Sequence, residues 1–186
     1  MTRIHSFAPI ARRDAKVLIL GSVPGVRSLE AVEYYAHPRN AFWEIMDALC
    51  GAARGLPYAQ RLERLQDAGI AVWDVLHSAE RQGSLDSAIQ HAIPNDLKGL
   101  LEACPSIELI ALNGSYASAT FKRYMRTTLE PRGNLRVVTL PSTSPANARA
   151  SLAQKLEVWR DALGPVLMKP ALLEPVLLES MLLKPK

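Results

Sequence analysis

The 186-residue sequence has little of what marks several large classes of protein. Its two cysteines, Cys50 and Cys104, form no Cys-x-x-Cys pair, so the sequence suggests neither a disulfide framework nor a zinc or iron–sulfur site. No uninterrupted apolar run reaches the roughly 18 residues of a membrane span, and residues 1–16 lack the apolar core of a signal peptide. We therefore expect a protein that stays inside the cell, in a reducing compartment, and off the membrane.

Three common catalytic signatures are also missing. The chain has no Gly-x-Ser-x-Gly elbow, no Walker phosphate loop and no cluster of side chains with metal-ligand spacing. These absences disfavour a small-molecule α/β hydrolase or nucleotidase, and no metal or cofactor is expected. A formal net charge of +4 is a mild basic excess, which permits a nucleic-acid partner without requiring one.

Four short runs rich in Val, Ile and Leu are apolar throughout, as strands buried on both faces are: residues 15–21, 69–76, 107–114 and 135–141. Helical patterns lie between them, and a last helix is expected over residues 147–163, ending at Gly164. This alternation predicts an α/β domain with a parallel sheet covered by helices on both faces. We place that domain at residues 1–164 and a Pro/Leu-rich extension at residues 165–186, where regular prolines prevent one continuous helix.

Small polar residues follow three of the four predicted strands, in GSVPG (residues 21–25), NGS (113–115) and PSTSPAN (141–147). Ligands of open parallel sheets bind beyond the carboxyl ends of the strands, so these loops should share one cleft with YYAHPRNAFW (34–43). A neutral amide such as Asn40 is no strong base, but it can orient a water. That assistance suits a bond that breaks largely by itself, such as an N-glycosidic bond.

Five segments resemble, in matching order over about residues 15–160, the signature blocks of the hypoxanthine-DNA glycosylases, the sixth family of the uracil-DNA glycosylase superfamily. They are GSVPGVRSL, YYAHPRNAFW, DV…SAERQGSLD, ALNG and LPSTSPANA. The resemblance implies a three-layer α/β/α fold with a central four-stranded parallel sheet. It also implies that a deaminated base, hypoxanthine or uracil or both, is flipped out of DNA and hydrolysed off its sugar without a cofactor.

The resemblance extends to partners and product. DNA that contains deaminated bases is the expected partner, and the expected form is a monomer in the cytoplasm of a bacterial-type cell, associated with the nucleoid through DNA. No lysine lies in the motif loops, so a lyase step is not expected and the product should be an abasic site.

Individual residues also take roles from the resemblance. Asn40 becomes the catalytic amide that positions the water, because Val23 stands where the related mismatch-specific uracil/thymine glycosylases carry their catalytic Asn. Tyr35 would stack on the extruded base, and Asn113 would read its edge. The expected base pocket consists of Gly21, Ser22, Val23, Pro24, Tyr35, His37, Phe42 and Asn113. The expected DNA contacts are Arg39, Ser142, Thr143, Ser144, Pro145 and Asn147.

Several of these residues also have simpler interpretations. Phe42 and Trp43 begin a helical pattern whose spacing favours core packing. His37 could orient its own loop, Asn113 could belong to a plain strand-to-helix turn, and PSTSPAN could do no more than cap a helix.

Other residues weaken the resemblance or stand outside it. Asp74 and Asp86 are interpreted as carboxylates that make structural hydrogen bonds. Leu140 replaces the His or Asn donor of typical uracil enzymes, so backbone N–H groups of GSVPG are the expected substitute. Val23 and Leu140 together leave open a catalytically weak or inactive damaged-DNA-binding relative. A basic stripe is interpreted as a phosphate-binding surface; it consists of Lys122, Arg123, Arg126, Arg132 and Arg136.

Overall fold

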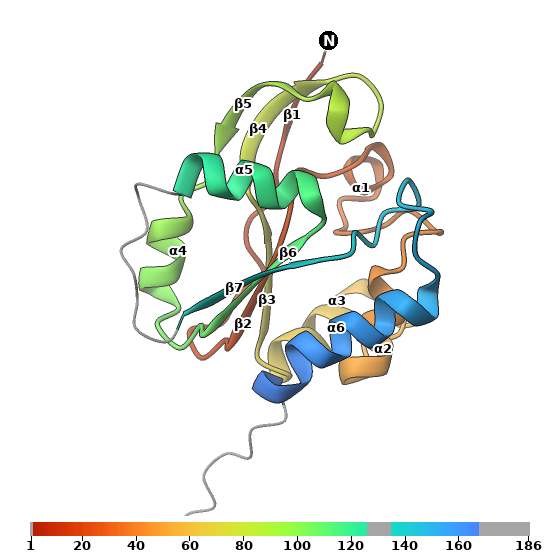
Figure 1. Cartoon of the computed structure of the whole chain (residues 1–186), viewed down its shortest axis with the longest axis vertical. Helices are drawn as coiled ribbons and strands as arrows, with labels where there is room; N and C mark the ends of the chain where they lie inside the picture. The colour runs from red at the N-terminus through yellow and green to blue at the C-terminus, as the bar shows by residue number, and fades with distance from the viewer. Residues whose placement is uncertain (1, 126–134, 168–186) are drawn as a thin grey trace, which may run out of the picture.

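The computed structural model of the chain describes residues 2–125 and 135–167. At its centre lies a parallel sheet with the strand order β3-β2-β6-β7 (Figure 1). Its strands are β2 (Val17–Gly21), β3 (Ile70–Asp74), β6 (Leu109–Asn113) and β7 (Arg136–Leu140). Each strand falls within one of the four apolar runs, so the predicted four-stranded parallel sheet is confirmed.

Strand β2 explains why these runs are apolar throughout. Val17 and Ile19 face one core cluster, and Leu18 and Leu20 face the other. The first cluster is covered by α2 (Phe42–Cys50), α3 (Tyr58–Asp67) and α6 (Leu152–Leu167); the second is covered by α4 (Leu97–Ala103) and α5 (Ser115–Met125). A central strand with helices on both faces has no polar side, and the three-layer α/β/α fold follows (Figure 1).

A second, antiparallel sheet was not predicted. It has the order β1-β4-β5 and consists of β1 (Thr2–His5), β4 (Leu76–Arg81) and β5 (Gln90–Pro94). The run over residues 69–76 was expected to be one strand, but the chain passes from β3 to β4 at Val75. Strand β4 carries His, Ser, Glu and Arg, so its sequence LHSAER did not look apolar. The short helix α1 (Val26–Ala31) and the 3-10 turn η1 (Asp86–Ala88) were also missed.

The last helix differs from its prediction at both ends. Helix α6 begins at Leu152, where Ser151 and Gln154 exchange the two hydrogen bonds of a capping box. It continues past Gly164 to Leu167, and Val166, only 4% exposed, belongs to the core. The interpretation of PSTSPAN as the cap of this helix is therefore wrong. The helix crosses the predicted boundary at residue 164, and residues 168–186 of the predicted extension lie outside the described residues.

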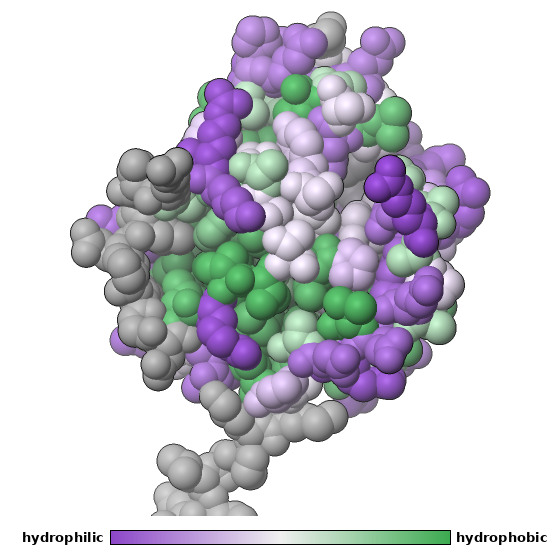
Figure 2. Space-filling view, in the orientation of Figure 1, coloured by the Kyte–Doolittle hydropathy of each residue, from purple (hydrophilic) through white to green (hydrophobic). Residues whose placement is uncertain are grey.

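Strand β7 forms an edge of the parallel sheet. Apolar side chains remain visible over the middle of the face in Figure 2, and Val137 of β7 is 45% exposed. Within residues 2–125 and 135–167, no helix is long and apolar enough to cross a membrane.

Candidate active site

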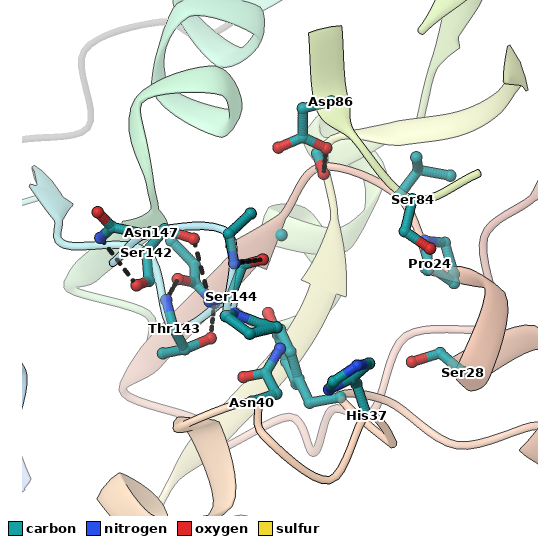
Figure 3. Close-up of a pocket in the computed structure, with 18 of the residues that line it drawn as sticks. Pro24, Ser28, His37, Asn40, Ser84, Asp86, Ser142, Thr143, Ser144 and Asn147 are labelled. Atoms are coloured by element: carbon teal, nitrogen blue, oxygen red, sulfur yellow. Dashed lines mark hydrogen bonds between the residues drawn. The ribbon is translucent and has the colours of Figure 1, made fainter. Parts of the chain in front are cut away.

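A pocket of about 770 Å³ opens where the strands of the parallel sheet end (Figure 3). Its lining includes Asn40 and, from the predicted base pocket, Gly21, Ser22, Val23, Pro24, Tyr35, His37 and Asn113. Of the predicted DNA contacts, it includes Ser142, Thr143, Ser144, Pro145 and Asn147. In Figure 3, Asn40 and His37 lie together at one end, across the pocket from Ser84 and Asp86. The signature loops therefore do meet in one cavity.

Two predicted residues lie outside the pocket lining. Phe42 is fully buried, and its ring stacks on Tyr35 with a centroid separation of 3.9 Å and an interplanar angle of 18°. Phe42 thus supports the pocket wall from behind, and the core packing expected for Phe42 and Trp43 is confirmed. Arg39 is exposed and is not part of the lining.

The Asn40 side chain is held by its own loop. Its Oδ1 accepts the backbone N–H of Phe42 at 3.0 Å, and its backbone N–H donates to the His37 carbonyl at 2.9 Å. Arg54 donates to the Asn40 carbonyl and forms an ion pair with Glu44 at 2.9 Å. An amide oxygen has two lone pairs, so one remains for a water, and the Nδ2 hydrogens bind no other described residue. The loop therefore orients an amide that still has hydrogen-bonding capacity towards the pocket.

The PSTSPAN loop (residues 141–147) is tied to the sheet and to α6. The Asn113 side chain and Thr143 exchange two hydrogen bonds of 2.9 Å. From α6, Trp159 donates to the Pro141 carbonyl at 3.0 Å, and Lys155 donates to the loop's last carbonyl, at residue 147, at 2.9 Å. The backbone N–H of Ala41 donates to the Thr143 carbonyl at 2.9 Å, which joins this loop to the one that carries Asn40.

Tyr35 occupies an unusual backbone conformation, with a φ of 55°. The preceding residue is held on both sides, since Trp43 Nε1 donates to the Tyr34 carbonyl at 3.1 Å and the Tyr34 N–H donates to the Tyr58 hydroxyl at 2.9 Å. Arg61, which sequence reasoning missed, stacks over both Trp43 and Tyr58 at 4.6 and 5.0 Å. A left-handed non-glycine residue persists only where its surroundings hold it, so this clamp places Tyr35 in the pocket.

Two carboxylates also line the pocket. The Oδ2 of Asp74 accepts the Ser6 hydroxyl at 2.9 Å, and the Oδ1 of Asp86 accepts the Ser22 hydroxyl at 2.7 Å. The structural hydrogen bonds predicted for both are therefore present. Burial raises the pKa of Asp74 to about 7 and also raises the pKa of Asp86. That both face the cavity was missed, although for Asp74 its position at the end of an apolar strand was a visible signal.

Other predicted features fall into place less completely. His37 Nδ1 accepts the Arg39 N–H at 3.1 Å, so His37 does orient its loop while also lining the pocket. Leu140 lines the pocket as an apolar, 4% exposed side chain, so it supplies no donor there.

The described members of the basic stripe, Lys122, Arg123 and Arg136, do not line the pocket, and Arg126 and Arg132 lie outside the described residues. The described residues contain no group of three or more His, Cys, Asp or Glu that could hold a metal ion.

Comparison with known proteins matches residues 8–163 to the family model of the uracil DNA glycosylase superfamily. The chain is 31% identical to a hypoxanthine DNA glycosylase from Methanosarcina barkeri, over 85% of this chain and 96% of the relative. It is 33% identical to one from Methanosarcina acetivorans, over 82% and 94%. A solution NMR structure from Methanosarcina acetivorans, provisionally named a uracil DNA glycosylase, superposes with a TM-score of 0.71 at 30% identity, covering 87% of this chain and 99% of that one.

Proposed function

This chain belongs to the uracil DNA glycosylase superfamily and, like its curated relatives, is a DNA N-glycosylase, and we propose that it removes hypoxanthine from DNA. Both curated relatives bear the name hypoxanthine DNA glycosylase, and each similarity spans more than four fifths of this chain. Uracil is a second proposed substrate, since both bases present a carbonyl next to an N–H. The relatives are archaeal, and the bacterial-type cytoplasmic location and the monomeric state stay predictions.

The observation that carries the proposal is the position of Asn40. Its amide lies in the pocket and is oriented by the bond from the Phe42 N–H. In the proposed reaction the target nucleotide rotates out of the duplex, its base enters the pocket, and Asn40 holds a water close to the sugar carbon as the glycosidic bond breaks. Water capture of the sugar leaves an abasic site, and no lysine among the described lining residues offers a Schiff base.

Polar residues of the pocket lining suit contacts to DNA phosphates. Ser144 and Asn147 are half-buried and line the pocket with the exposed Arg149, which sequence reasoning did not single out. Such contacts would set the register of the enzyme on the duplex without reading its sequence.

The test is Asn40→Ala, assayed on duplexes that carry deoxyinosine or deoxyuridine and then treated with alkali. We expect base release to fall by about 100-fold or more, because the water loses its support, while binding to the damaged duplex persists. Asn40→Asp is the matched control, since it keeps an oxygen for the Phe42 N–H and for the water. It should melt like the wild type and release more base than Asn40→Ala.

Equal rates for the two variants would contradict water positioning by Asn40. No detectable release by the purified wild type on any deaminated base would instead favour the damaged-DNA-binding alternative.

A further inference from the structure

The inner part of the pocket carries two polar groups with unused bonding capacity. Asp74, at the end of β3, is 3% exposed and lies opposite Gly21 in the sheet register. Its Oδ2 is occupied by Ser6, whereas its Oδ1 accepts no hydrogen bond from any described residue. The Tyr35 hydroxyl is buried and makes no hydrogen bond of standard geometry to a described residue, although the nearby Asn113 side chain lowers its pKa. Buried polar groups normally find partners, so this pair can still bind a ligand.

The two oxygens lie close to each other beside Gly21. A Cβ at this position would lie 2.6 Å from Asp74 Oδ1 and 3.1 Å from the Tyr35 hydroxyl. Both oxygens therefore gather over the same backbone atom at the end of β2. Both residues line the pocket, so the carboxyl group of Asp74 lies within the wall that faces a bound base.

The charges around Asp74 do not neutralise it. Arg81 is the nearby cation, but its guanidinium donates to the Pro24 and Gly83 carbonyls, and no ion pair joins it to a carboxylate among the described residues. Asp86 adds a second negative charge, and the two neighbouring tyrosines, at positions 34 and 35, are neutral at ordinary pH, because a phenol has a pKa of about 10 and burial raises the pKa of both hydroxyls further. Burial followed by the charge of Asp86 raises the pKa of Asp74 to about 7, so the neutral acid is available near neutral pH.

We propose that Asp74 is the acid that protonates the purine as it leaves the sugar. This inference rests on the proposed removal of hypoxanthine. It fills the gap left by Leu140, which offers no proton at the pocket wall. A purine has a basic N7 in the same five-membered ring as N9, which carries the sugar, and protonation of N7 turns a poor anionic leaving group into a neutral one.

The step balances as follows. The Asp74 carboxyl proton moves to N7 of the base, and the bond between N9 and the sugar C1′ breaks with both electrons going to the base. Water held at Asn40 adds to C1′ and loses one proton to solvent, and a solvent proton later restores Asp74. A uracil leaves as an anion spread over two carbonyls, so it depends less on this acid.

The test compares the wild type with Asp74→Asn in single-turnover release of hypoxanthine between pH 5.5 and 9. An acid is active only when protonated, so the wild-type rate should be level below pH 7 and fall about tenfold per pH unit above it. Asp74→Asn keeps an oxygen for the Ser6 hydroxyl but has no proton to give. We expect its rate at pH 6 to be about 100-fold lower, with no fall at higher pH and a smaller loss on uracil.

Ser6→Ala separates Asp74 from the other ionisable side chains that line the pocket. The Ser6 hydroxyl lowers the pKa of Asp74, so its removal should move the fall in rate to higher pH. An unmoved fall in Ser6→Ala would assign it to another group and overturn the proposal.

A second substrate gives an independent readout. In 7-deaza-deoxyinosine a C–H replaces N7, so the wild type should release this base at least about 100-fold more slowly than hypoxanthine. It should release it no faster than Asp74→Asn releases hypoxanthine. Equal losses from Asp74→Asn on both substrates would overturn the role of Asp74, provided that the variant melts and binds DNA like the wild type. Failure of the wild type to release hypoxanthine would instead refute the proposed function.

Discussion

Asn113 and Thr143 exchange two hydrogen bonds, one from Nδ2 to the hydroxyl and one from the Thr143 N–H to Oδ1, each 2.9 Å long. The pair continues the contact between β6 and β7 beyond their last paired residues, Asn113 and Leu140. An asparagine that was expected to read a base edge therefore also anchors the loop beside it. Only the remaining lone pair and the second amide hydrogen are left for a base.

Replacing Asn113 should loosen this loop. Asn113→Ala removes both bonds, each worth about 1 kcal/mol, and leaves a partly buried N–H without a partner, so we expect the free energy of unfolding to fall by about 1 to 3 kcal/mol. Asn113→Asp keeps an acceptor for both Thr143 groups and should stay closer to the wild type. Urea unfolding of the three proteins measures the difference. Identical midpoints for Asn113→Ala and the wild type would show that the pair does not anchor the loop.

Gly21 is required for space rather than for backbone conformation. In Gly21→Ala the new Cβ would press on Asp74 Oδ1 at 2.6 Å and on the Tyr35 hydroxyl at 3.1 Å, so we expect about 1 to 3 kcal/mol of lost stability and a strong loss of base release. Gly25→Ala is the matched control in the same loop, because its Cβ would meet Ser84 Oγ at an ordinary 3.5 Å. Thermal melting and single-turnover rates should change in Gly21→Ala and stay near wild type in Gly25→Ala.

Arg61 should influence catalysis without touching the pocket. Its guanidinium stacks on the rings of Trp43 and Tyr58, which hold the backbone of Tyr34, and it pairs with Glu33 at 2.8 Å. Arg61→Met removes both interactions, and we expect about 1 to 3 kcal/mol of lost stability together with a lower rate of base release, because Tyr35 is then held less firmly.

Arg61→Lys keeps the charge but loses the flat stacking surface, so it should fall between the wild type and Arg61→Met. Rates are compared at a temperature where all three proteins are fully folded. A variant that melts earlier yet releases base at the wild-type rate would show that the clamp serves stability alone.

The sequence predicted the features that depend on local pattern. The apolar runs predicted the parallel sheet, and the polar loops after them predicted the cavity that contains Asn40. For Phe42 two predictions competed: the resemblance placed it in the base pocket, whereas helical spacing predicted the core. The spacing was right, because Phe42 opens a helix whose apolar side packs on the sheet. The environment of Asp74 could not be predicted, since its partner Ser6 lies 68 residues away and its burial depends on how the two sheets meet.

The hydrogen bond from the Ala41 N–H to the Thr143 carbonyl couples two walls of the cavity, so neither can swing aside without straining the other. In the proposed reaction, walls coupled in this way would not widen to admit a paired base, so the damaged pair would have to open before its base enters the cavity. Weakly paired lesions would then enter the cavity more often than undamaged bases, because their base pairs open more easily. Part of the selectivity would therefore come from the stability of the base pair rather than from contacts with the protein.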